Sequence, residues 1–371
     1  SDQLPDHLFD PQLIRVAGWT LVHFLWQATL IGTGVGLAKR LLRRHEASWR
    51  YGVSCVGLVS MSLAATTTAI ALAFSKVSPA PFSISITWIE SQLPWVYFAW
   101  VVGVTGLSLR LAGGWVLIYR LKRLADPVHK GLQDRVDVLK RSLGVSRPVR
   151  VFRSALVRVP MVVGWFKPVI LIPGSLVTGI PAAELEALLS HELSHIRRYD
   201  YLVNGLQTFV ETVFFFHPAV WWVSKQIRIE REHCCDDLVL TTADKVTYTR
   251  ALVDLEEHRG AGFSFSFSGV GVRADGGHLV TRIRRLVTAP ESNGSNGSKL
   301  VSAFAMVAVM LGSVQMSDAG HTTMLSLQTD VLPIEVSFRI FQDRPSSPVS
   351  IERIAASTAR QGPVESVVQA S

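Results

Sequence analysis

Four long apolar stretches limit what this chain can fold into. They cover residues 16–38, 51–75, 95–119 and 300–316, and each is near the roughly 20 residues that a helix needs to cross about 30 Å of hydrocarbon. The chain is 48% hydrophobic and only 18% charged, which is too apolar for an ordinary soluble domain. We therefore expect a mainly α-helical membrane protein with four transmembrane helices, the last being the shortest.

The distribution of basic residues predicts the orientation. Segments 39–50 and 119–130 are rich in Lys and Arg, whereas segment 76–94 holds one Lys and one Glu. Because basic flanks resist translocation, we expect a multi-pass protein of the cytoplasmic (inner) cell membrane with its N-terminus outside. The opening segment has no basic region, so the first stretch is expected to be a retained helix. The net charge of +8 then reflects topology and does not predict direct binding to nucleic acid.

These expectations divide the chain into four parts. Residues 1–122 form three transmembrane helices with short loops, residues 123–298 a cytoplasmic α+β domain, residues 299–317 the fourth transmembrane helix, and residues 318–371 a short external tail. Within the domain, residues 131–145 carry a helical apolar stripe, and residues 147–176 are rich in β-branched residues, Pro and Gly, which indicates short strands. One of them is expected to be an edge strand, because Pro at both ends limits ladder pairing; it comprises Pro168, Val169, Ile170, Leu171, Ile172 and Pro173.

A metal-binding motif follows, in a helix that is expected to start near Pro181. His191, Glu192 and His195 spell H-E-x-x-H, which places two imidazoles one helical turn apart on one face with a carboxylate beside them. The His and Glu content of the chain gives about 0.01 such matches by chance, so the motif is specific. It is typical of zinc peptidases.

Residues 201–223 are long and apolar enough to be mistaken for a further transmembrane helix. If they crossed the membrane, every ligand downstream would lie about 30 Å from the motif. Pro218 lacks an N–H and favours the start of a new helix, so we expect a membrane-associated hairpin of two helices hinged at His217 and Pro218. Its aromatic residues at 214–216, 221 and 222 are expected either at the membrane interface or in a buried core.

The returning helix offers the third protein ligand that a catalytic zinc requires. The candidates are its acidic, His and Cys residues Glu230, Glu232, His233, Cys234, Cys235, Asp236 and Asp237. Glu232 and Asp236 share a face, which fits a carboxylate ligand followed by a carboxylate that accepts a hydrogen bond from a ligating histidine. A Cys ligand would suit a closed structural site better, so both Cys are interpreted as packing residues. Together with Cys55 they predict no disulfide framework.

Residues 160–240, which include "PMVVGWFKPVILIPGSL", "LLSHELSHIRRYDYLVN" and "EREHCCDDLVL", closely resemble the BlaR/MecR antirepressor family of membrane zinc metallopeptidases, peptidase family 56. The resemblance extends over most of the chain and implies three N-terminal transmembrane helices, a cytoplasmic gluzincin-like zinc metallopeptidase domain and a fourth helix. It also implies that His191, His195 and Glu232 hold one Zn²⁺ per chain, with Glu192 as the catalytic base. Asp236 then matches a carboxylate that orients a ligating histidine.

The function that follows is an integral-membrane zinc metalloendopeptidase in transmembrane signal transduction. Its expected partners are the lipid bilayer, a cytoplasmic protein substrate such as a transcriptional repressor, and a second copy of the chain in a homodimer. The strand at residues 168–173 is expected to hold an extended substrate by backbone pairing. Arg228, Arg231 and Arg282 are candidates for stabilising the oxyanion.

The chain departs from the sensor members of the family after residue 316. No Lys follows Lys299, so the tail has no Ser-x-x-Lys motif and antibiotic sensing is not predicted; residues 334–341 alternate like a single strand. Residues 259–299 contain Gly and Ser clusters, for which self-cleavage and a passive linker are the two hypotheses. Two other functions stay open: a quality-control membrane protease resembling HtpX, and a scaffold without catalysis, against which the intact motif argues.

Overall fold

The structure is a computed structural model that describes residues 10–74, 84–164, 168–259 and 275–288. All of these residues belong to the first of two units of the chain, Ser1–His321. Helices dominate the described part, and a small four-stranded sheet accompanies them. The predicted fourth transmembrane helix at 299–317, the tail at 318–371 with its expected strand, and most of the Gly/Ser segment lie outside the described residues.

Three helices are long and apolar enough to cross a membrane, as the first three apolar stretches predict. They are α2 (Pro11–Leu41), which the short helix η1 (Leu42–Arg44) extends, α3 (Ala47–Phe74) and α4 (Ile84–Arg123). Helix α4 starts earlier than expected and continues through Pro94. A proline is tolerated inside such a helix because neighbouring groups can satisfy the carbonyl that it leaves free.

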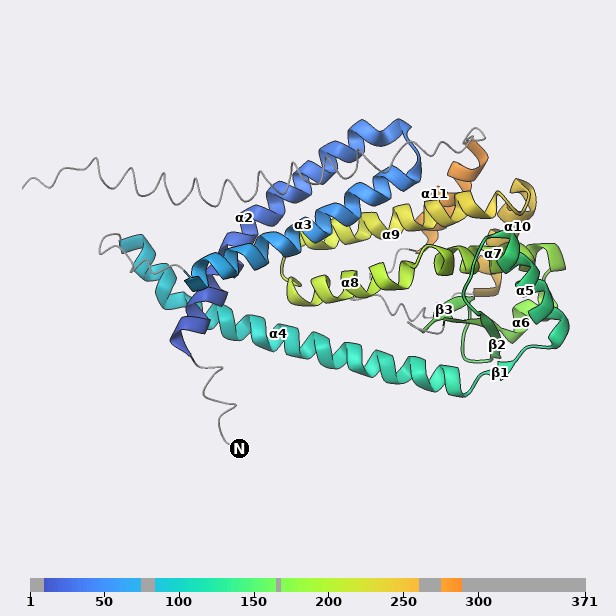
Figure 1. Ribbon diagram of the computed structural model, residues 1–371, viewed down its shortest axis with the longest axis horizontal. Helices are drawn as coiled ribbons and strands as arrows, with labels where there is room; N and C mark the ends of the chain where they lie inside the picture. Colours follow the sequence, from blue (N-terminus) through green and yellow to red (C-terminus); the bar gives the residue numbers. More distant parts are fainter. Residues whose placement is uncertain (1–9, 75–83, 165–167, 260–274, 289–371) are drawn as a thin grey trace, which may run out of the picture. The chain divides into compact units, whose positions relative to one another are not determined.

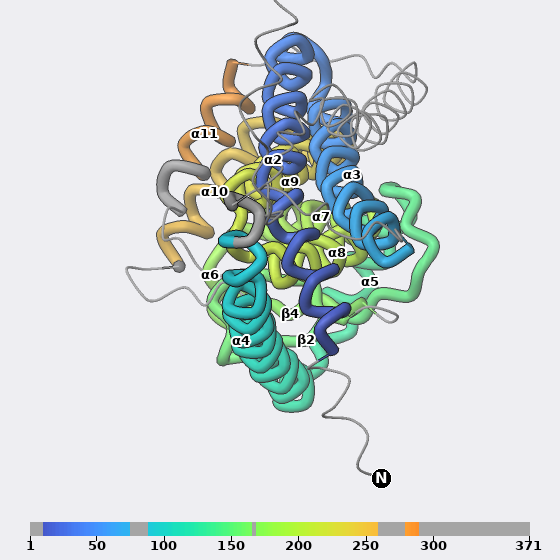
Figure 2. Tube along the Cα trace, turned by 90° about the vertical axis from the view of Figure 1, so that its left-hand side faces the viewer, coloured from blue at the N-terminus to red at the C-terminus, as the bar shows by residue number. Residues whose placement is uncertain are grey.

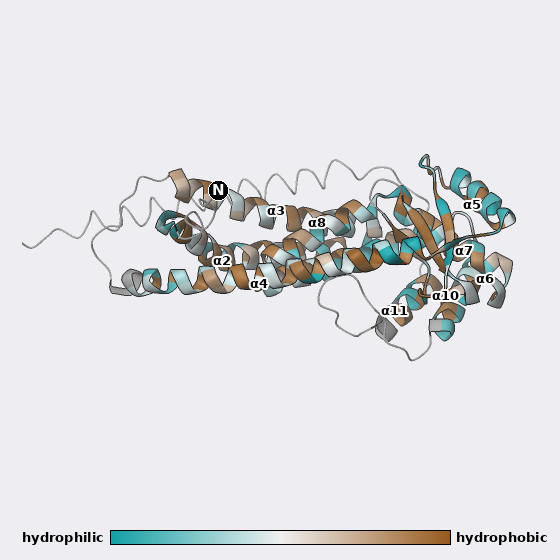
Figure 3. Cartoon of the chain, turned by 90° about the horizontal axis from the view of Figure 1, so that it is seen from below, coloured by the Kyte–Doolittle hydropathy of each residue, from teal (hydrophilic) through white to brown (hydrophobic). Residues whose placement is uncertain are grey.

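Helices α2 and α3 pack against each other and against the later helix α9 (Pro218–Val239). Figures 1 and 2 show the three helices side by side. Their shared core is fully buried and apolar, and includes Phe24, Ala28, Leu58, Met61, Val223 and Ile227. Helix α4 is far more exposed, with Trp95, Val102 and Leu109 each about 70% exposed, and Figure 3 shows hydrophobic residues in brown along its ribbon. An apolar surface of this length is what a lipid-facing helix presents.

The predicted break at His217 and Pro218 is present, whereas the association of the two helices with a membrane stays a prediction. Helix α8 (Asp200–Val213) ends before the aromatic residues, and α9 begins at Pro218. The ring of His217 caps α9, because its Nδ1 accepts a hydrogen bond from the Ala219 N–H while its Nε2 donates one to the Leu25 carbonyl on α2. Phe214 is buried and stacks on a phenylalanine of α2, as expected for a core residue, whereas Trp222 is 40% exposed and its place at a membrane interface stays a prediction.

The remaining elements form an α+β layer structure. The sheet contains β1 (Asp126–Pro127), β2 (Arg150–Ser154), β3 (Met161–Val163) and β4 (Val169–Pro173), and the helices around it are α5 (Lys130–Ser142), α6 (Gly174–Gly179), α7 (Ala182–Arg197), α10 (Lys245–Arg259) and α11 (Asp275–Thr288). Leu185, Leu189 and Leu193 of α7 pack on buried residues of β4. This packing fixes α7, and with it the H-E-x-x-H motif, against the sheet.

The prediction that residues 168–173 form an edge strand is wrong. The strand order is β1-β2-β4-β3, and β4 pairs in parallel with β2 and antiparallel with β3. Pro168 precedes the strand and Pro173 ends it, so neither removes a hydrogen bond from the interior of the ladder. All five residues of β4 are buried. This strand therefore has no free edge for a substrate, and β3 is the edge strand next to it.

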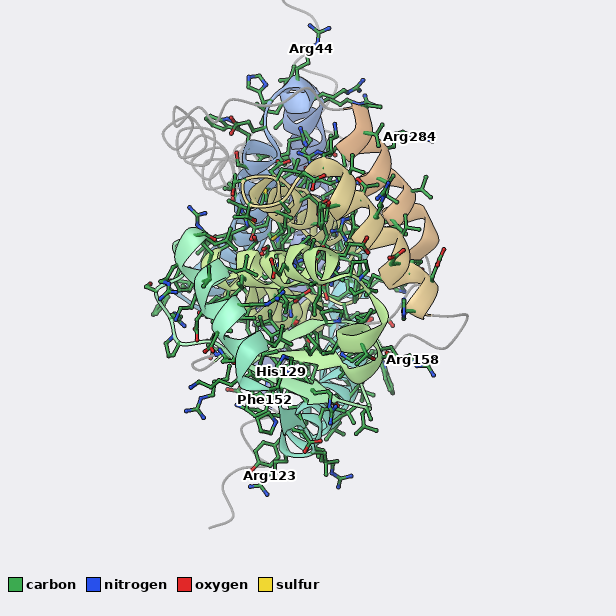
Figure 4. All side chains as sticks on the ribbon, turned by 90° about the vertical axis from the view of Figure 1, so that its right-hand side faces the viewer. Arg44, Arg123, His129, Phe152, Arg158 and Arg284 are labelled. Atoms are coloured by element: carbon green, nitrogen blue, oxygen red, sulfur yellow. The ribbon has the colours of Figure 1, made fainter. Side chains whose placement is uncertain are left out.

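Basic side chains gather where two of the long helices end. Arg43 and Arg44 lie in η1 after α2, and Arg120 and Arg123 lie in the last turn of α4. The labelled Arg44 and Arg123 point away from the ribbon in Figure 4. In Figure 1 both ends lie on the side of the unit that carries the sheet and α7. The two ends thus share the charge pattern expected on one face of a membrane.

Candidate metal centre

The motif residues lie in the second half of α7, which the Pro181 cap starts and which ends at Arg197. His191 is buried, and Glu192 and His195 are half-buried. The two imidazole rings are 4.8 Å apart between centroids and nearly perpendicular. The i, i+4 spacing therefore brings two ring nitrogens to the same side of one helix, as the sequence predicts.

Helix α9 brings Glu232 to the same two rings. Its carboxylate oxygens lie 3.3 Å from His191 Nε2 and 3.9 Å from His195 Nε2. Donors that bind zinc at 2.0–2.1 Å with tetrahedral angles are about 3.3 Å apart, so the two nitrogens and the carboxylate fit a zinc ion. Within the part of the chain that the structure describes, these three residues form one of two groups able to hold a metal.

The second group uses the other nitrogen of His195. It joins His195 with Asp200 at the start of α8 and with Cys235 of α9. The Asp200 carboxylate lies 2.8 Å from His195 Nδ1, and the Cys235 sulfur lies 3.3 Å from the same atom. Asp200 and Cys235 are almost fully buried. An acceptor in this position fixes the ring of a ligating histidine and directs its Nε2 toward the metal.

A parallel arrangement lies behind His191. Its Nδ1 donates to the Tyr248 hydroxyl at 2.9 Å, and this hydroxyl donates to Asp236 at 2.6 Å. Asp236 itself is 3.5 Å from His191 Nδ1. Arg282 of α11 completes the network, because its guanidinium donates two hydrogen bonds to Asp236 and one to Tyr248. Asp236 is thus placed where it acts on His191 chiefly through Tyr248.

The local charges keep both carboxylates ionised. Burial raises the pKa of Glu232, but its hydrogen bond with His191 and the nearby charges of His195 and Arg282 hold that pKa well below its usual value. Burial also raises the pKa of Asp236, and Arg282 outweighs it, so this pKa is lowered too. An ionised carboxylate is the form that binds a metal or accepts a hydrogen bond from a metal ligand.

A cavity of about 420 Å³ opens over these groups. His191, Glu192, His195 and Glu232 line one part of it. The rest of the lining comes from β3 and the residues before it, from the start of α8, and from α9, α10 and α11. These lining residues are Val159, Pro160, Met161, Val162, Tyr201, Asn204, Arg231, Leu252 and Arg282. The Glu192 carboxylate therefore shares one open space with the candidate ligands.

The other candidates from the sequence are placed elsewhere. Glu230 binds Lys39 of α2 and Arg50 of α3 at 3.0 Å each, away from the two imidazoles. Asp237 pairs with Arg285 of α11. Cys234 is buried, and His233 lies against Glu230 rather than near the two ring nitrogens of the motif.

The three arginines considered for the oxyanion also differ in position. Arg228 pairs with Glu211 between α8 and α9 and does not line the cavity. Arg282 lines it, but its guanidinium is engaged by Asp236. Arg231 lines the cavity with its Nε 3.6 Å from Glu232, and within the described residues this Nε–H donates no hydrogen bond.

Sequence reasoning missed the two groups that fix the imidazoles. Asp200 follows His195 by five residues and starts the next helix. This short separation could have indicated that its carboxylate lies near the His195 ring. Tyr199 just before it has a left-handed backbone conformation, with φ 58° and ψ 32°, which turns the chain sharply between α7 and α8. Tyr248 gave no signal, because its role depends on how α10 packs across α7.

Comparison with known proteins identifies the family. The model of the family described as BlaR1 peptidase M56 matches residues 13–286. The regulatory protein BlaR1 of Bacillus licheniformis is 32% identical over 167 residues, which cover 44% of this chain and 28% of that protein. The methicillin resistance mecR1 protein of Staphylococcus aureus is 27% identical over 32% of this chain and 20% of its own length. BlaR1 of Staphylococcus aureus is 21% identical over 57% of this chain and 36% of its own length.

The matched regions thus span well under half of each of these relatives. The family model, by contrast, covers most of this chain, including the three long helices, the sheet and the motif helix. The chain belongs to the BlaR1 peptidase M56 family.

Proposed function

We propose that this chain is an integral-membrane zinc metalloendopeptidase that holds one zinc ion with His191, His195 and Glu232. The observation that carries the proposal is the convergence of two imidazole nitrogens and one carboxylate in an open cavity beside Glu192. Two His and one Glu leave a coordination position free for water or substrate, which hydrolytic zinc sites require. In this proposal the second group holds no metal, and its residues Asp200 and Cys235 support the His195 ring through its Nδ1.

The residues around the cavity divide the chemistry. Zinc, when bound, polarises a peptide carbonyl and lowers the pKa of a water molecule toward 7. Glu192 accepts the proton of the attacking water and gives it to the leaving amine nitrogen. Asp200 and Tyr248 hold the two rings by their Nδ1 atoms, so that both Nε2 atoms face the cavity. Arg231 is the cation we assign to the charge that develops on the carbonyl oxygen.

The substrate lies along β3 in this proposal. Met161 and Val162 of β3 line the cavity, and β4 occupies one edge of this strand. No other strand of the described residues pairs with its second edge. An extended peptide can add to such an edge through main-chain hydrogen bonds. This assignment replaces the expectation that residues 168–173 bind the substrate.

The membrane position follows from the charged ends of the helices. Arg44 and Arg123 end the first and third transmembrane helices in this proposal, and basic residues stay on the cytoplasmic side. The N-terminus is then outside and the metal centre cytoplasmic, where the substrate is a soluble protein such as a transcriptional repressor. The relatives are named as a regulatory protein and a methicillin resistance protein, which supports a role in signalling.

The proposed cytoplasmic substrate can be tested by identifying the new N-termini that cleavage creates. Membranes that contain the wild-type chain or Glu192→Ala are incubated with the soluble proteins of the same cells, and the peptides that begin at new N-termini are identified by mass spectrometry. We expect a few cleaved proteins, including a DNA-binding repressor, with wild type only. Many unrelated cleaved proteins would favour a quality-control protease, and identical peptides from both samples would contradict proteolysis.

A further inference from the structure

The start of α3 contacts two carboxylates, one near the candidate ligand Glu232 and one that supports the candidate ligand His195. Arg50 binds Glu230 through its Nε at 3.0 Å, and Lys39 of α2 binds the other oxygen of Glu230 at 3.0 Å. Glu230 has only 6% of its side chain exposed and lies two residues before Glu232 on α9. The membrane helices thus hold the turn of α9 from which the carboxylate ligand extends.

Tyr51, the next residue of α3, reaches the support of His195. Its hydroxyl donates a hydrogen bond to Asp200 Oδ1 at 3.4 Å, while Asp200 Oδ2 accepts the His195 N–H at 2.8 Å. Arg198 contacts both Tyr51 and Asp200. Its guanidinium lies 4.7 Å from the centre of the Tyr51 ring, and its Nε lies 3.5 Å from the Asp200 carboxylate. One carboxylate therefore connects a transmembrane helix to a metal ligand by two consecutive hydrogen bonds.

Asp200 lies at a tightly constrained point of the chain. It is 3% exposed, and it follows Tyr199, whose left-handed conformation is uncommon for a residue with a side chain. Arg147 covers the rings of Tyr199 and Tyr201 and donates to the Tyr201 hydroxyl, which holds the junction from the other side. A shift of α3 would directly break the hydrogen bond of the Tyr51 hydroxyl with Asp200 and the contact of the Tyr51 ring with Arg198.

We propose that the first turn of α3 is a positioning element of the metal centre, in which Tyr51 is the positioning residue that holds Asp200 against His195. The proposal rests on the proposed zinc site and adds a regulatory consequence. A movement of α3 within the membrane changes the orientation of the His195 ring and the affinity for zinc. The transmembrane helices are then a part of the site's control as well as its anchor.

Zinc affinity of the full-length chain in detergent tests the proposal. Dissociation constants are measured by competition with a chromogenic chelator, and the absorption spectrum of the Co²⁺-loaded chain reports the ligand geometry. Tyr51→Phe removes only the hydroxyl, and we expect its affinity for zinc to fall by roughly threefold to tenfold, less than the 10–100-fold typical of a direct support residue. The matched control is Tyr97→Phe, a buried tyrosine of α4 whose ring contacts Phe98 and Trp100.

A double-mutant cycle of Tyr51 and Asp200 distinguishes a positioning role of Tyr51 from a general effect on stability. In an Asp200→Ala background the hydroxyl has no acceptor on α8, so Tyr51→Phe should produce no further loss of affinity. If Asp200→Ala does not fold, the Co²⁺ spectrum decides: it should change in Tyr51→Phe and match wild type in Tyr97→Phe.

The outcomes distinguish this inference from the proposed function. An unchanged affinity and spectrum in Tyr51→Phe, or an equal loss in both backgrounds, would overturn the positioning role and leave the zinc peptidase intact. A wild-type chain that takes up no zinc would overturn the proposed function and this inference together.

Discussion

Replacing Asp236 by Ala removes the acceptor at the centre of the network behind His191. Asp236 is fully buried and accepts hydrogen bonds from Tyr248 at 2.6 Å and from Arg282 at 2.5 and 3.0 Å. Without it, the tyrosine no longer has its acceptor, and the Arg282 guanidinium is left 3.6 Å from the ligand Glu232. Two of the three ligands are affected, so we expect zinc affinity to fall by about 100-fold, or about 2.7 kcal/mol, at the upper end of the range for such residues.

Chelator competition on the purified chain measures this loss, and the neighbouring residue provides the control. Asp237 lies on the same helix and also pairs with an arginine of α11, but it does not line the cavity. Asp237→Ala should therefore keep the wild-type zinc affinity. Equal affinities of Asp236→Ala and wild type would refute the reasoning. Equal losses in both variants would show that docking of α11, and not orientation of His191, is what matters.

Three further predictions test the ligands, the helix packing and the topology. Glu232→Ala should lose zinc by elemental analysis, whereas Glu230→Ala should keep most of it, because only the former carboxylate faces both imidazoles; zinc retained in Glu232→Ala would assign the third ligand elsewhere. Gly57→Leu should lower thermal stability in detergent, because a Cβ there would overlap a valine of α2, while Gly34 has open space and its Leu variant should melt near wild type. A reporter fused after Arg123 should be cytoplasmic, and an external signal would reverse the proposed orientation.

The long apolar helices and the break between α8 and α9 could be predicted because local sequence decides them. Uninterrupted apolar length predicts a span, and three of the four stretches correspond to long apolar helices in the described residues. Pro218 decides the hairpin, since a residue without an N–H starts a helix far more easily than it continues one. Pro94 shows the limit of that argument, because α4 continues through it.

The position of β4 could not be predicted from its prolines. A proline at a strand end restricts pairing only at that residue, and the pairing partners of the interior residues depend on where the chain before and after the strand returns. Residues 150–154 and 161–163 return on opposite sides of β4. The apolar run at 169–172, buried on both faces, was the better indication of a central strand.

The convergence of His191, His195 and Glu232 could be predicted from the sequence, whereas the groups that contact the two imidazoles mostly could not. H-E-x-x-H fixes its own geometry on one helix, and the downstream Glu232 is limited to the helix that returns. Tyr248 and Arg282 come from α10 and α11, whose places beside the site depend on tertiary packing. Tyr51 comes from α3, 149 residues before Asp200, a separation over which no local pattern carries information.

The central claim is that His191, His195 and Glu232 hold one zinc ion on which Glu192 performs peptide hydrolysis. The most direct measurement is zinc content and hydrolysis of an unstructured protein, such as casein, by purified full-length wild type and Glu192→Gln. Glu192 lines the cavity without belonging to the ligand group, so we predict one zinc per chain in both and a loss of hydrolysis by several orders of magnitude in the variant. A variant that loses its zinc, or one that hydrolyses the substrate as fast as wild type, would contradict the account.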